Sequence, residues 1–468
     1  MRRQRAWIAA VVLMAAALLA SGCASVPRDA GVSEVQKRIE EQGLKIAWSP
    51  DQPIEAPDDA KLQPLLQGEL TVERAVEIAL AHNRDLLAAM EDLGLARADL
   101  IAASTVRNPV FDGEIRFPGK PFEIGITQTL IDLFQLRSRR ALGQAEFEAE
   151  RLRLAGAVIG FAAEVRADWY VLQAAQQALT QQRTIAEAAQ ASAELALRQH
   201  DAGNISDLDL ENEQAIYERA KLDLARVELD EIQARERLLA DLGAMTTLPL
   251  TLPPQAAPAA EPSAQEVEAA LTNRLDLSLA RAEIEAARRA LPLARSETWD
   301  ELALGVHHEQ EPEGEATTGP ALALPIPIFD RGMAGRTRAA ATLRQAEQRL
   351  HALTVTARSE ARAAMERLVE AKARAEYLRD VVVPRRQRIL QLTQLEYNAM
   401  LLGIYDLIRA RQGLADALRE QVTAVRDYWL ARTGLETAMS GVTGFSVRAE
   451  RPQMELSEPS TRQESREH

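Results

Sequence analysis

Two long stretches of this sequence, residues 137–200 and 333–397, have the seven-residue hydrophobic repeat of a coiled coil. Both are rich in Ala, Glu, Gln, Arg and Leu, which favour helix. Every seventh position is small or apolar, at Val158, Val165, Leu172, Leu179, Ala186 and Ala193, and again at Leu343, Leu350, Ala357, Ala364, Ala371 and Leu378. At 1.5 Å per residue, sixty-odd helical residues span roughly 90 Å. A compact domain needs no helix of that length, so the chain is predicted to cross an extended space.

The composition agrees with a helical protein and limits its partners. Of the 468 residues, 47% are hydrophobic but only 4% are aromatic, which is typical of Ala-rich helices. The net charge of −14 argues against nucleic acid and fits either a soluble surface or a negative pore lining. With a single cysteine, the chain has neither an intrachain disulfide nor a Cys-rich zinc site.

The N-terminus has the pattern of a bacterial lipoprotein signal. A basic segment, Met1–Arg5, precedes an apolar segment, Ala6–Ala20, that is too short to span a bilayer. The sequence Leu-Ala-Ser-Gly-Cys at 19–23 resembles a lipobox, whose cysteine is acylated after cleavage. An ordinary signal peptide with an incidental cysteine is the alternative, but Cys23 is the only cysteine in the chain. Ala24, rather than Asp, follows it, which predicts sorting to the outer membrane.

Two segments have the period-two pattern of β-hairpins. In the first, strands at 111–117 and 122–130 flank the turn Pro118–Pro121, and each strand has one apolar and one polar face. In the second, strands are predicted at 301–309 and 321–328, around an acidic loop at 309–319. Such hairpins could be half of an ordinary sheet packed on a core, but nothing else nearby is strand-like. Tilted strands of this length can cross a membrane.

The whole plan of helix, hairpin, long helix, tip and helix occurs twice. Asn83-Arg84-Asp85-Leu86 in the first helix, capped by Thr71 and extending to about Thr105, reappears as Asn273-Arg274-Leu275-Asp276-Leu277 in the second. Pro384 is expected to bend or break the second long helix. The predicted boundaries are a signal peptide at 1–22, a lipid-anchored tether at 23–68, a first repeat at 69–247 with its hairpin at about 110–130, a Pro-rich linker at 248–263, a second repeat at 264–441 with its hairpin at about 301–328, and a disordered tail at 442–468.

Four strands per chain are too few to close a membrane barrel, because the smallest such barrels have eight. Three chains would supply twelve strands and leave no exposed edge. The spacing of the hairpins therefore favours a trimer that shares one barrel.

The order of these motifs resembles the outer-membrane efflux factors, the TolC-like proteins, over residues 68–440. The motifs concerned are Leu70–Ala81 followed by Asn83-Arg84-Asp85-Leu86, Ala202-Gly203 with Leu208-Asp209-Leu210, Tyr397-Asn398 with Asp406-Leu407, and Leu324–Gly332. The last, which contains Pro-Ile-Pro-Ile-Phe-Asp-Arg-Gly, is similar to a run frequent in the lipid-anchored, heavy-metal-efflux branch. Each motif alone is loose, but their order over two repeats is specific.

The resemblance implies a mainly α fold with a β-barrel, and a homotrimer in which a 12-stranded outer-membrane barrel continues as a periplasmic α-helical barrel. It implies partners in a periplasmic adaptor (membrane fusion) protein and an inner-membrane pump of the resistance-nodulation-division type, besides outer-membrane lipid. Such a chain is a conduit rather than an enzyme and carries no cofactor. It would be lipid-anchored in the outer membrane and extend into the periplasm.

The resemblance also implies two kinds of functional residue at the tips. Those that contact the adaptor are Gly203, Asn204, Ile205, Ser206, Leu402, Gly403, Ile404 and Tyr405. Asp406 aligns with an Asp ring that closes the pore, repelling anions and concentrating cations. The family archetype has a second Asp where this chain has Arg409, which can instead pair with Asp406 at i,i+3. Tyr397 aligns with a tyrosine that bonds to an acid in the other tip, here Asp209.

Other interpretations of the same residues remain open at this stage. Asp406 and Asp209 could be ordinary helix N-terminal charges on a solvated face. The six histidines form no His-Glu-x-x-His motif, and the adjacent His307 and His308 of a strand point to opposite faces, which disfavours a shared metal ion. A coiled-coil envelope lipoprotein explains the helices and the lipid but leaves the hairpins unused. Within transport, metal cations are favoured by the branch resemblance, and organic drugs are the alternative.

Overall fold

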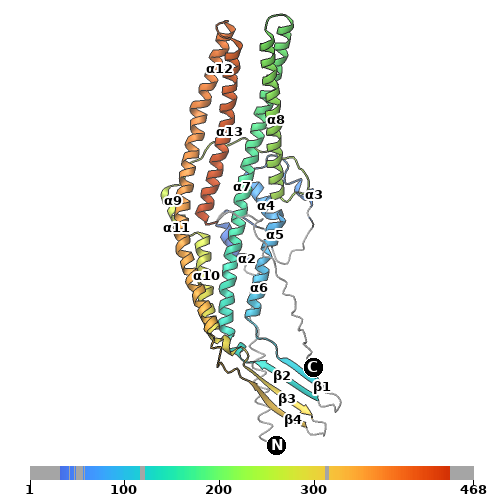
Figure 1. Cartoon of the computed structure of the whole chain (residues 1–468), viewed down its shortest axis with the longest axis vertical. Coiled ribbons are helices and arrows are strands. Elements are labelled where there is room, and N and C mark those ends of the chain that lie inside the picture. Colours follow the sequence, from blue (N-terminus) through green and yellow to red (C-terminus); the bar gives the residue numbers. More distant parts are fainter. Residues whose placement is uncertain are drawn as a thin grey trace, which may run out of the picture.

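The computed structural model describes residues 32–442, apart from 42, 47, 49–55, 57, 116–121 and 311–315. Its helices form one long bundle with two paired tips at one end and a β-sheet at the other (Figure 1). The predicted signal peptide, Cys23 and the tail after 442 lie outside the described residues, as does the turn between the first two strands.

The first predicted helix is in fact three helices, α4 (Val72–His82), α5 (Arg84–Met90) and α6 (Asp92–Ala103). Asn83 causes the first break because its backbone is extended and its side chain caps α5, accepting a hydrogen bond from the Leu86 backbone N–H at 2.9 Å. Its amide also donates to the Asp241 carbonyl at 3.1 Å. Thr71 caps α4 as predicted, accepting from the Arg74 backbone N–H.

The first long helix, α7 (Ile131–Asp201), is continuous over 71 residues. All six of its predicted seam residues are buried, and it pairs with α8 (Asp207–Asp241) to form the first tip. Small side chains at Ala186, Ala189 and Ala220 form the contact near that tip and allow close approach of the two backbones.

The second repeat contains α9 (Ala264–Thr272), α10 (Leu275–Ser296) and the long α11 (Met333–Tyr377). As predicted from Pro384, the α-helix is interrupted, and α11 ends at Tyr377. A π-helical turn, Leu378–Val382, separates it from α12 (Val383–Asn398), in which Pro384 lies in the first turn where its missing N–H costs nothing. The last helix, α13 (Ile404–Ser440), returns along α12 and α11. In the portion of the chain described above, none of the helices combines the length and apolar character needed to cross a bilayer.

One four-stranded antiparallel sheet joins the two repeats, in the order β1 (Val110–Ile115), β2 (Phe122–Thr129), β3 (Ala303–Gln310), β4 (Ala316–Ala323). The two hairpins are therefore not separate, because β2 pairs with β3, for example Ile126 opposite Val306. The prediction of the fourth strand at 321–328 was wrong by about five residues. Pro325 and Pro327 have no N–H to donate to a ladder, so pairing ends at Ala323 although the apolar alternation continues.

The two faces of this sheet differ in chemistry. One face carries large apolar side chains that nothing covers within the described chain: Phe111, Ile124, Ile126, Leu304, Val306 and Leu322 are all exposed. The other face carries Asp112, Glu123 and His307 across three neighbouring strands. A cross-strand Gly125 makes room there, because an added Cβ would lie within 3 Å of both Asp112 and His307. An apolar outside and a polar inside are what a membrane barrel requires.

The N-terminal segment predicted to be a tether packs on the helices instead. In its described part, α2 (Val32–Glu40) buries Val32, Val35 and Ile39 in the core that also contains Trp169 of α7. A short helix, α3 (Asp59–Leu62), follows, and the Asp59 carboxylate accepts hydrogen bonds from Met245 and Thr246. Because the hydrophobic periodicity of this segment is weak, the sequence did not predict that its apolar residues would complete the core.

The Pro-rich segment 248–263 ties the two repeats together. It starts against the first repeat, where Leu248 and Leu250 are buried and the Gln173 amide donates to the Pro253 carbonyl at 2.7 Å. It ends against the second, where the Ala259 N–H donates to the Tyr428 hydroxyl at 2.9 Å. This linker is therefore a packed strap across the middle of the bundle.

An aromatic contact reinforces the same level of the bundle. Tyr170 of α7 stacks on Trp429 of α13, with ring centroids 5.1 Å apart and planes 12° from parallel. Burial raises the pKa of the Tyr170 hydroxyl to about 12. Neighbouring Trp169 donates its indole N–H to the Leu70 carbonyl at 2.9 Å. The helices α7 and α13 are thus held together by ring packing as well as by the strap of residues 248–263.

Arg274 organises the second repeat from a position where it is only 1% exposed. Its guanidinium donates to Asp276 at 2.6 and 3.0 Å and to Glu360 of α11 at 3.1 Å. It also donates to the backbone carbonyls of Ala357 and Ala438, so that one side chain joins α10, α11 and α13. Arg274 is the N-cap residue of α10, as Asn83 is of α5 in the first repeat.

We expect Arg274→Met to destabilise the protein by about 3 kcal/mol, because it leaves buried acidic and carbonyl oxygens without their donor. Thermal unfolding followed by circular dichroism measures this loss. Arg288→Met is the matched control, since the Arg288–Glu285 pair lies on an exposed helix face, where such pairs contribute about 0.5 kcal/mol. Equal effects of the two substitutions would contradict the organising role of Arg274.

Candidate functional site: the helical tips and the groove between them

The first tip is a tight turn stabilised at both ends. α7 ends at Asp201, and Gly203 takes a left-handed conformation with φ of +75°. Ser206 then caps α8 in a capping box, in which Asp209 bonds back to the Ser206 backbone N–H at 3.2 Å. Gly203 and Ser206 thus mark the end of one helix of the tip and the start of the other. Gly203, Asn204 and Ser206 are exposed at the end of the molecule, with Ile205 half-buried.

The second tip is less polar and has no side-chain cap. α12 ends at Asn398, Met400 adopts a φ of +60° and Gly403 precedes α13. Leu402 and Ile404 are half-buried, and the exposed apolar side chains around them are Leu395, Met400 and Leu401. An exposed apolar tip on a long helical hairpin is a surface suited to another protein.

The hydrogen bond that joins the two tips differs from the predicted one. The Tyr405 hydroxyl donates to the Asp209 carboxylate, which connects the first turn of α13 to the first turn of α8. Within the described residues, Tyr397 makes no recorded hydrogen bond to Asp209, so the expected Tyr397–Asp209 pair is replaced. Tyr405 had been expected only as an adaptor contact, and its place beside Asp209 follows from packing that no local motif encodes.

Asp406 and Arg409 lie as the i,i+3 pairing predicts. The Arg409 guanidinium lies 3.9 Å from the Asp406 carboxylate. The Arg409 side chain is 77% exposed and the Asp406 side chain is 44% exposed. At that distance and exposure the attraction is weak. Asp406 therefore remains available to act with copies of itself.

A second charged pair closes the base of the first tip. His200 in the last turn of α7 lies 2.6 Å from the Asp207 carboxylate in the first turn of α8, and 3.8 Å from Asp201. The hydrogen bond with Asp207 raises the pKa of the His200 imidazole. The carbonyl end of α7 also favours a protonated imidazole. The residues between the pair, 201–206, form the turn that the sequence assigned to partner contact.

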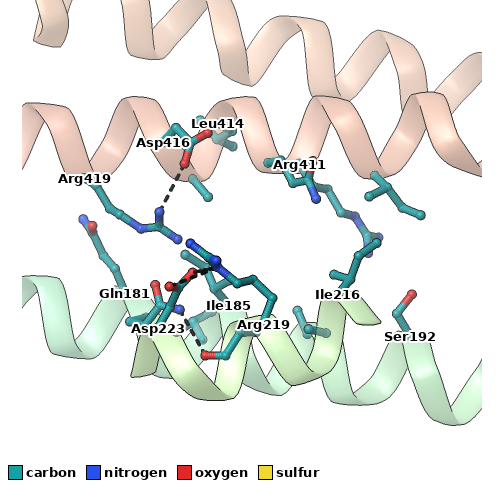
Figure 2. Close-up of a pocket in the computed structure, with 18 of the residues that line it drawn as sticks. Gln181, Ile185, Ser192, Ile216, Arg219, Asp223, Arg411, Leu414, Asp416 and Arg419 are labelled. Carbon is teal, nitrogen blue, oxygen red and sulfur yellow. Dashed lines mark hydrogen bonds and ion pairs between the residues drawn. The ribbon is translucent and has the colours of Figure 1, made fainter. Parts of the chain in front are cut away.

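Between the two tips lies a groove of about 1190 Å³. Figure 2 shows Arg219 projecting into it from α8, and Arg411 and Arg419 from α13. Arg219 pairs with Asp223 at 3.3 Å and Arg419 with Asp416 at 3.2 Å, whereas no ion pair is recorded for Arg411 within the described chain. Side-chain oxygens of Gln181, Gln182 and Glu213 are buried beside the groove without a protein partner. The helical pairs are therefore loosely joined here.

The barrel-side histidines do not converge. His307 points toward Glu123 at 3.3 Å, whereas His308 bonds to Thr318 at 2.7 Å, as expected for adjacent residues of one strand. Over the described parts of the chain, no three His, Cys, Asp or Glu side chains are grouped to hold a metal ion.

Comparison with known proteins agrees with this architecture. Residues 119–244 match the protein family described as outer membrane efflux protein. The chain is 24% identical over 365 residues to the cobalt-zinc-cadmium resistance protein CzcC of Cupriavidus metallidurans, covering 75% of this chain and 85% of that protein. Over residues 119–244 the chain is therefore similar to the outer membrane efflux proteins.

Solved structures share the fold. The Campylobacter jejuni CmeC outer membrane channel superposes with a TM-score of 0.67 at 16% identity, covering 86% of this chain and 92% of that one. CusC, described as forming a transmembrane channel, gives 0.65 at 18% identity, covering 84% and 98%. The chain thus has the mainly helical fold of these outer membrane channels.

The His200–Asp207 pair predicts a pH-dependent tip. Folding raises the pKa of His200. The His200–Asp207 pair therefore stabilises the tip fully below the ordinary histidine pKa of about 6.5, and this stabilisation is lost as the pH rises through the raised pKa. Hydrogen exchange of residues 201–206, corrected for its intrinsic pH dependence, should be slower at low pH in the wild type. His200→Gln should remove that dependence, whereas His351→Gln, on α11, should retain it. A wild type without pH dependence would contradict the assignment.

Proposed function

We propose that three copies of this chain form an efflux conduit that is closed at the helical tips and opened by a periplasmic adaptor linked to an inner-membrane pump of the resistance-nodulation-division type. The observation that carries the proposal is the combination, in one chain, of an uncovered apolar sheet face and a 71-residue helix. Three such sheets supply twelve strands, enough for a barrel. The helices are long enough to extend well into the periplasm.

The gate residues are Asp406, Tyr405 and Asp209. Three Asp406 carboxylates around a threefold axis would repel anions and concentrate cations at the narrowest point. The Tyr405–Asp209 hydrogen bond holds the α12–α13 tip against the α7–α8 tip, and the groove behind it leaves space for the tips to move apart. The weak contact of Arg409 reduces but does not cancel the charge of Asp406.

The adaptor is expected to meet the loops at the ends of the two hairpins. These loops are Gly203, Asn204, Ile205 and Ser206 in the first tip, and Leu402, Gly403, Ile404 and Tyr405 in the second. Since Tyr405 belongs to both the loop and the gate, an adaptor that engaged its ring would also break the bond to Asp209. Acylation of Cys23 would add an anchor to the outer membrane at the other end of the molecule.

Single-channel conductance in planar bilayers tests the gate. Tyr405→Phe keeps the ring but loses the hydroxyl, so its closed-to-open ratio should fall roughly fivefold per protomer, the value of one modest hydrogen bond. Asp406→Ala should lose cation selectivity, because it removes the proposed ring of charge. Glu370→Ala, which removes an exposed carboxylate from α11 away from the tips, should match the wild type. If both tip variants also match the wild type while conducting, the gate lies elsewhere.

Metal cations are the proposed cargo. The supporting observation is the similarity to CzcC, described as a cobalt-zinc-cadmium resistance protein. A host that lacks the gene should become sensitive to cobalt, zinc or cadmium salts, and the cloned gene should restore growth. Sensitivity to organic dyes and drugs, with unchanged metal tolerance, would favour organic cargo. Because the pump and adaptor choose the substrate, the test uses the host's complete system.

A further inference from the structure

The segment between β4 and α11 is unusually apolar for a connection that lies in the open. Leu324, Ile326 and Ile328 continue the alternation of Leu322 beyond the end of the hydrogen-bonded strand, and all are exposed. Phe329 follows and is 97% exposed. In Figure 1 this connection runs beside the junction of sheet and helices. The efflux function described above gives this segment no role.

The strands alone are short for the membrane they serve. An eight-residue strand is about 26 Å long, and at a tilt of about 40° it spans roughly 20 Å, against an apolar band of about 25 Å. The extended run Leu324–Ile328 adds apolar length on the helix side of the sheet. Its two prolines remove backbone donors that lipid would leave unsatisfied.

Aromatic side chains gather at the same level from three connections. Phe134 in the first turn of α7 is 75% exposed, Trp299 lies just before β3, and Phe329 lies just before α11. The connections touch, since a Cβ added to Gly332 would come within 2.9 Å of Thr298, and the Leu130 N–H donates to the Leu302 carbonyl at 2.8 Å. Membrane barrels carry such aromatic belts at the bilayer interface.

Positive charge follows the aromatic residues directly. Residues 131–140 and 331–340 hold six arginines and a single acid, Asp132, in a chain that has 69 acidic and 55 basic residues overall. Asp132 is buried and paired with Arg107 and Arg139, at 2.8 and 3.2 Å. The other five arginines are exposed, and no ion pair is recorded for them within the described chain: Arg137, Arg140, Arg331, Arg336 and Arg338. Acidic residues Glu297, Asp300 and Glu301 lie on the adjoining α10–β3 connection.

We propose that these residues form a collar that seats the channel in the phosphate-bearing inner leaflet of the outer membrane. The exposed side chains of Leu324, Ile326 and Ile328 reach the acyl chains from the edge of the leaflet. Phe134, Trp299 and Phe329 mark the interface, and the five arginines bind lipid phosphates. Apolar, aromatic and basic layers in this order match the layers of a phospholipid leaflet. The proposal rests on the outer-membrane placement of the sheet and adds where its membrane boundary lies.

Photo-crosslinking from position 329 identifies what covers the collar. Benzoylphenylalanine replaces Phe329 in the full chain, reconstituted with phosphatidylethanolamine and phosphatidylglycerol, and intact mass separates the products. A phospholipid adduct supports the collar, whereas a crosslink to a second chain or no adduct overturns it. The same label at Ile126 on the sheet face must give lipid adducts, and at Leu222 on α8 must not. Failure at Ile126 as well would overturn the membrane placement itself, which keeps the two failures distinct.

The charge layer is tested by exchanging three arginines together. Arg331→Gln, Arg336→Gln and Arg338→Gln should lower the ratio of phosphatidylglycerol to phosphatidylethanolamine bound in native mass spectra by at least about fivefold, the value of one arginine near an anionic surface. The matched control, Arg344→Gln with Arg349→Gln and Arg362→Gln, changes the same charge further along α11 and should leave the ratio unchanged. Equal ratios for both triple variants would contradict phosphate binding at the collar.

Discussion

This architecture depends on one constraint, which is that a single chain forms a four-stranded sheet that it cannot close into a barrel. β1 and β4 each have one unpaired edge, and the apolar face with Ile126 and Val306 is uncovered. Unpaired backbone groups in lipid cost several kcal/mol each, so the sheet can enter a membrane only as part of a closed barrel. Closure by copies of the same chain then fixes the symmetry of everything attached to the strands. In the proposed trimer, the helices, the tips and the proposed gate residues would all inherit a threefold arrangement from that one requirement.

Within the chain, the two repeats have to move as one body at the sheet and remain separable at the tips. Pairing of β2 with β3 fuses them at the membrane, and the strap 248–263 with the Tyr170–Trp429 stack fixes them at mid-height. Beyond that level the contact gives way to the groove, where Arg219 and Arg419 pair with acids on their own helices. The bundle is thus tightly packed next to the sheet and loosely joined near the tips, where the proposed gate would open.

Periodic and capping signals made much of this predictable from the sequence. The heptads of α7, the glycine turn at Gly203 and the Ser206 cap are local features, and the structure has them where expected. Three features were not local. The apolar alternation of Leu324 and Ile326 imitates a strand, but pairing depends on donors that proline lacks. The weakly periodic 32–48 segment packs because the rest of the core leaves apolar surface for Val35 and Ile39. The choice of Tyr405 over Tyr397 as the partner of Asp209 depends on how two distant hairpins align.

The energetics of the tips suit a channel opened by its partners. Asp406–Arg409 is long and exposed, and the bond from Tyr405 to Asp209 is a single hydrogen bond at the surface. Contacts of this kind contribute little individually, so in the proposed trimer a few weak interactions, repeated three times, would hold the closed state. An adaptor that bound the apolar side chains of Met400 and Leu401 could supply more free energy than those interactions hold. The largest buried side chains, by contrast, include Arg274 and Leu172 of the α7 seam, which lie far from the tips. Under the proposed function, this division between a rigid shaft and a weak tip would let docking of an adaptor decide when the conduit opens.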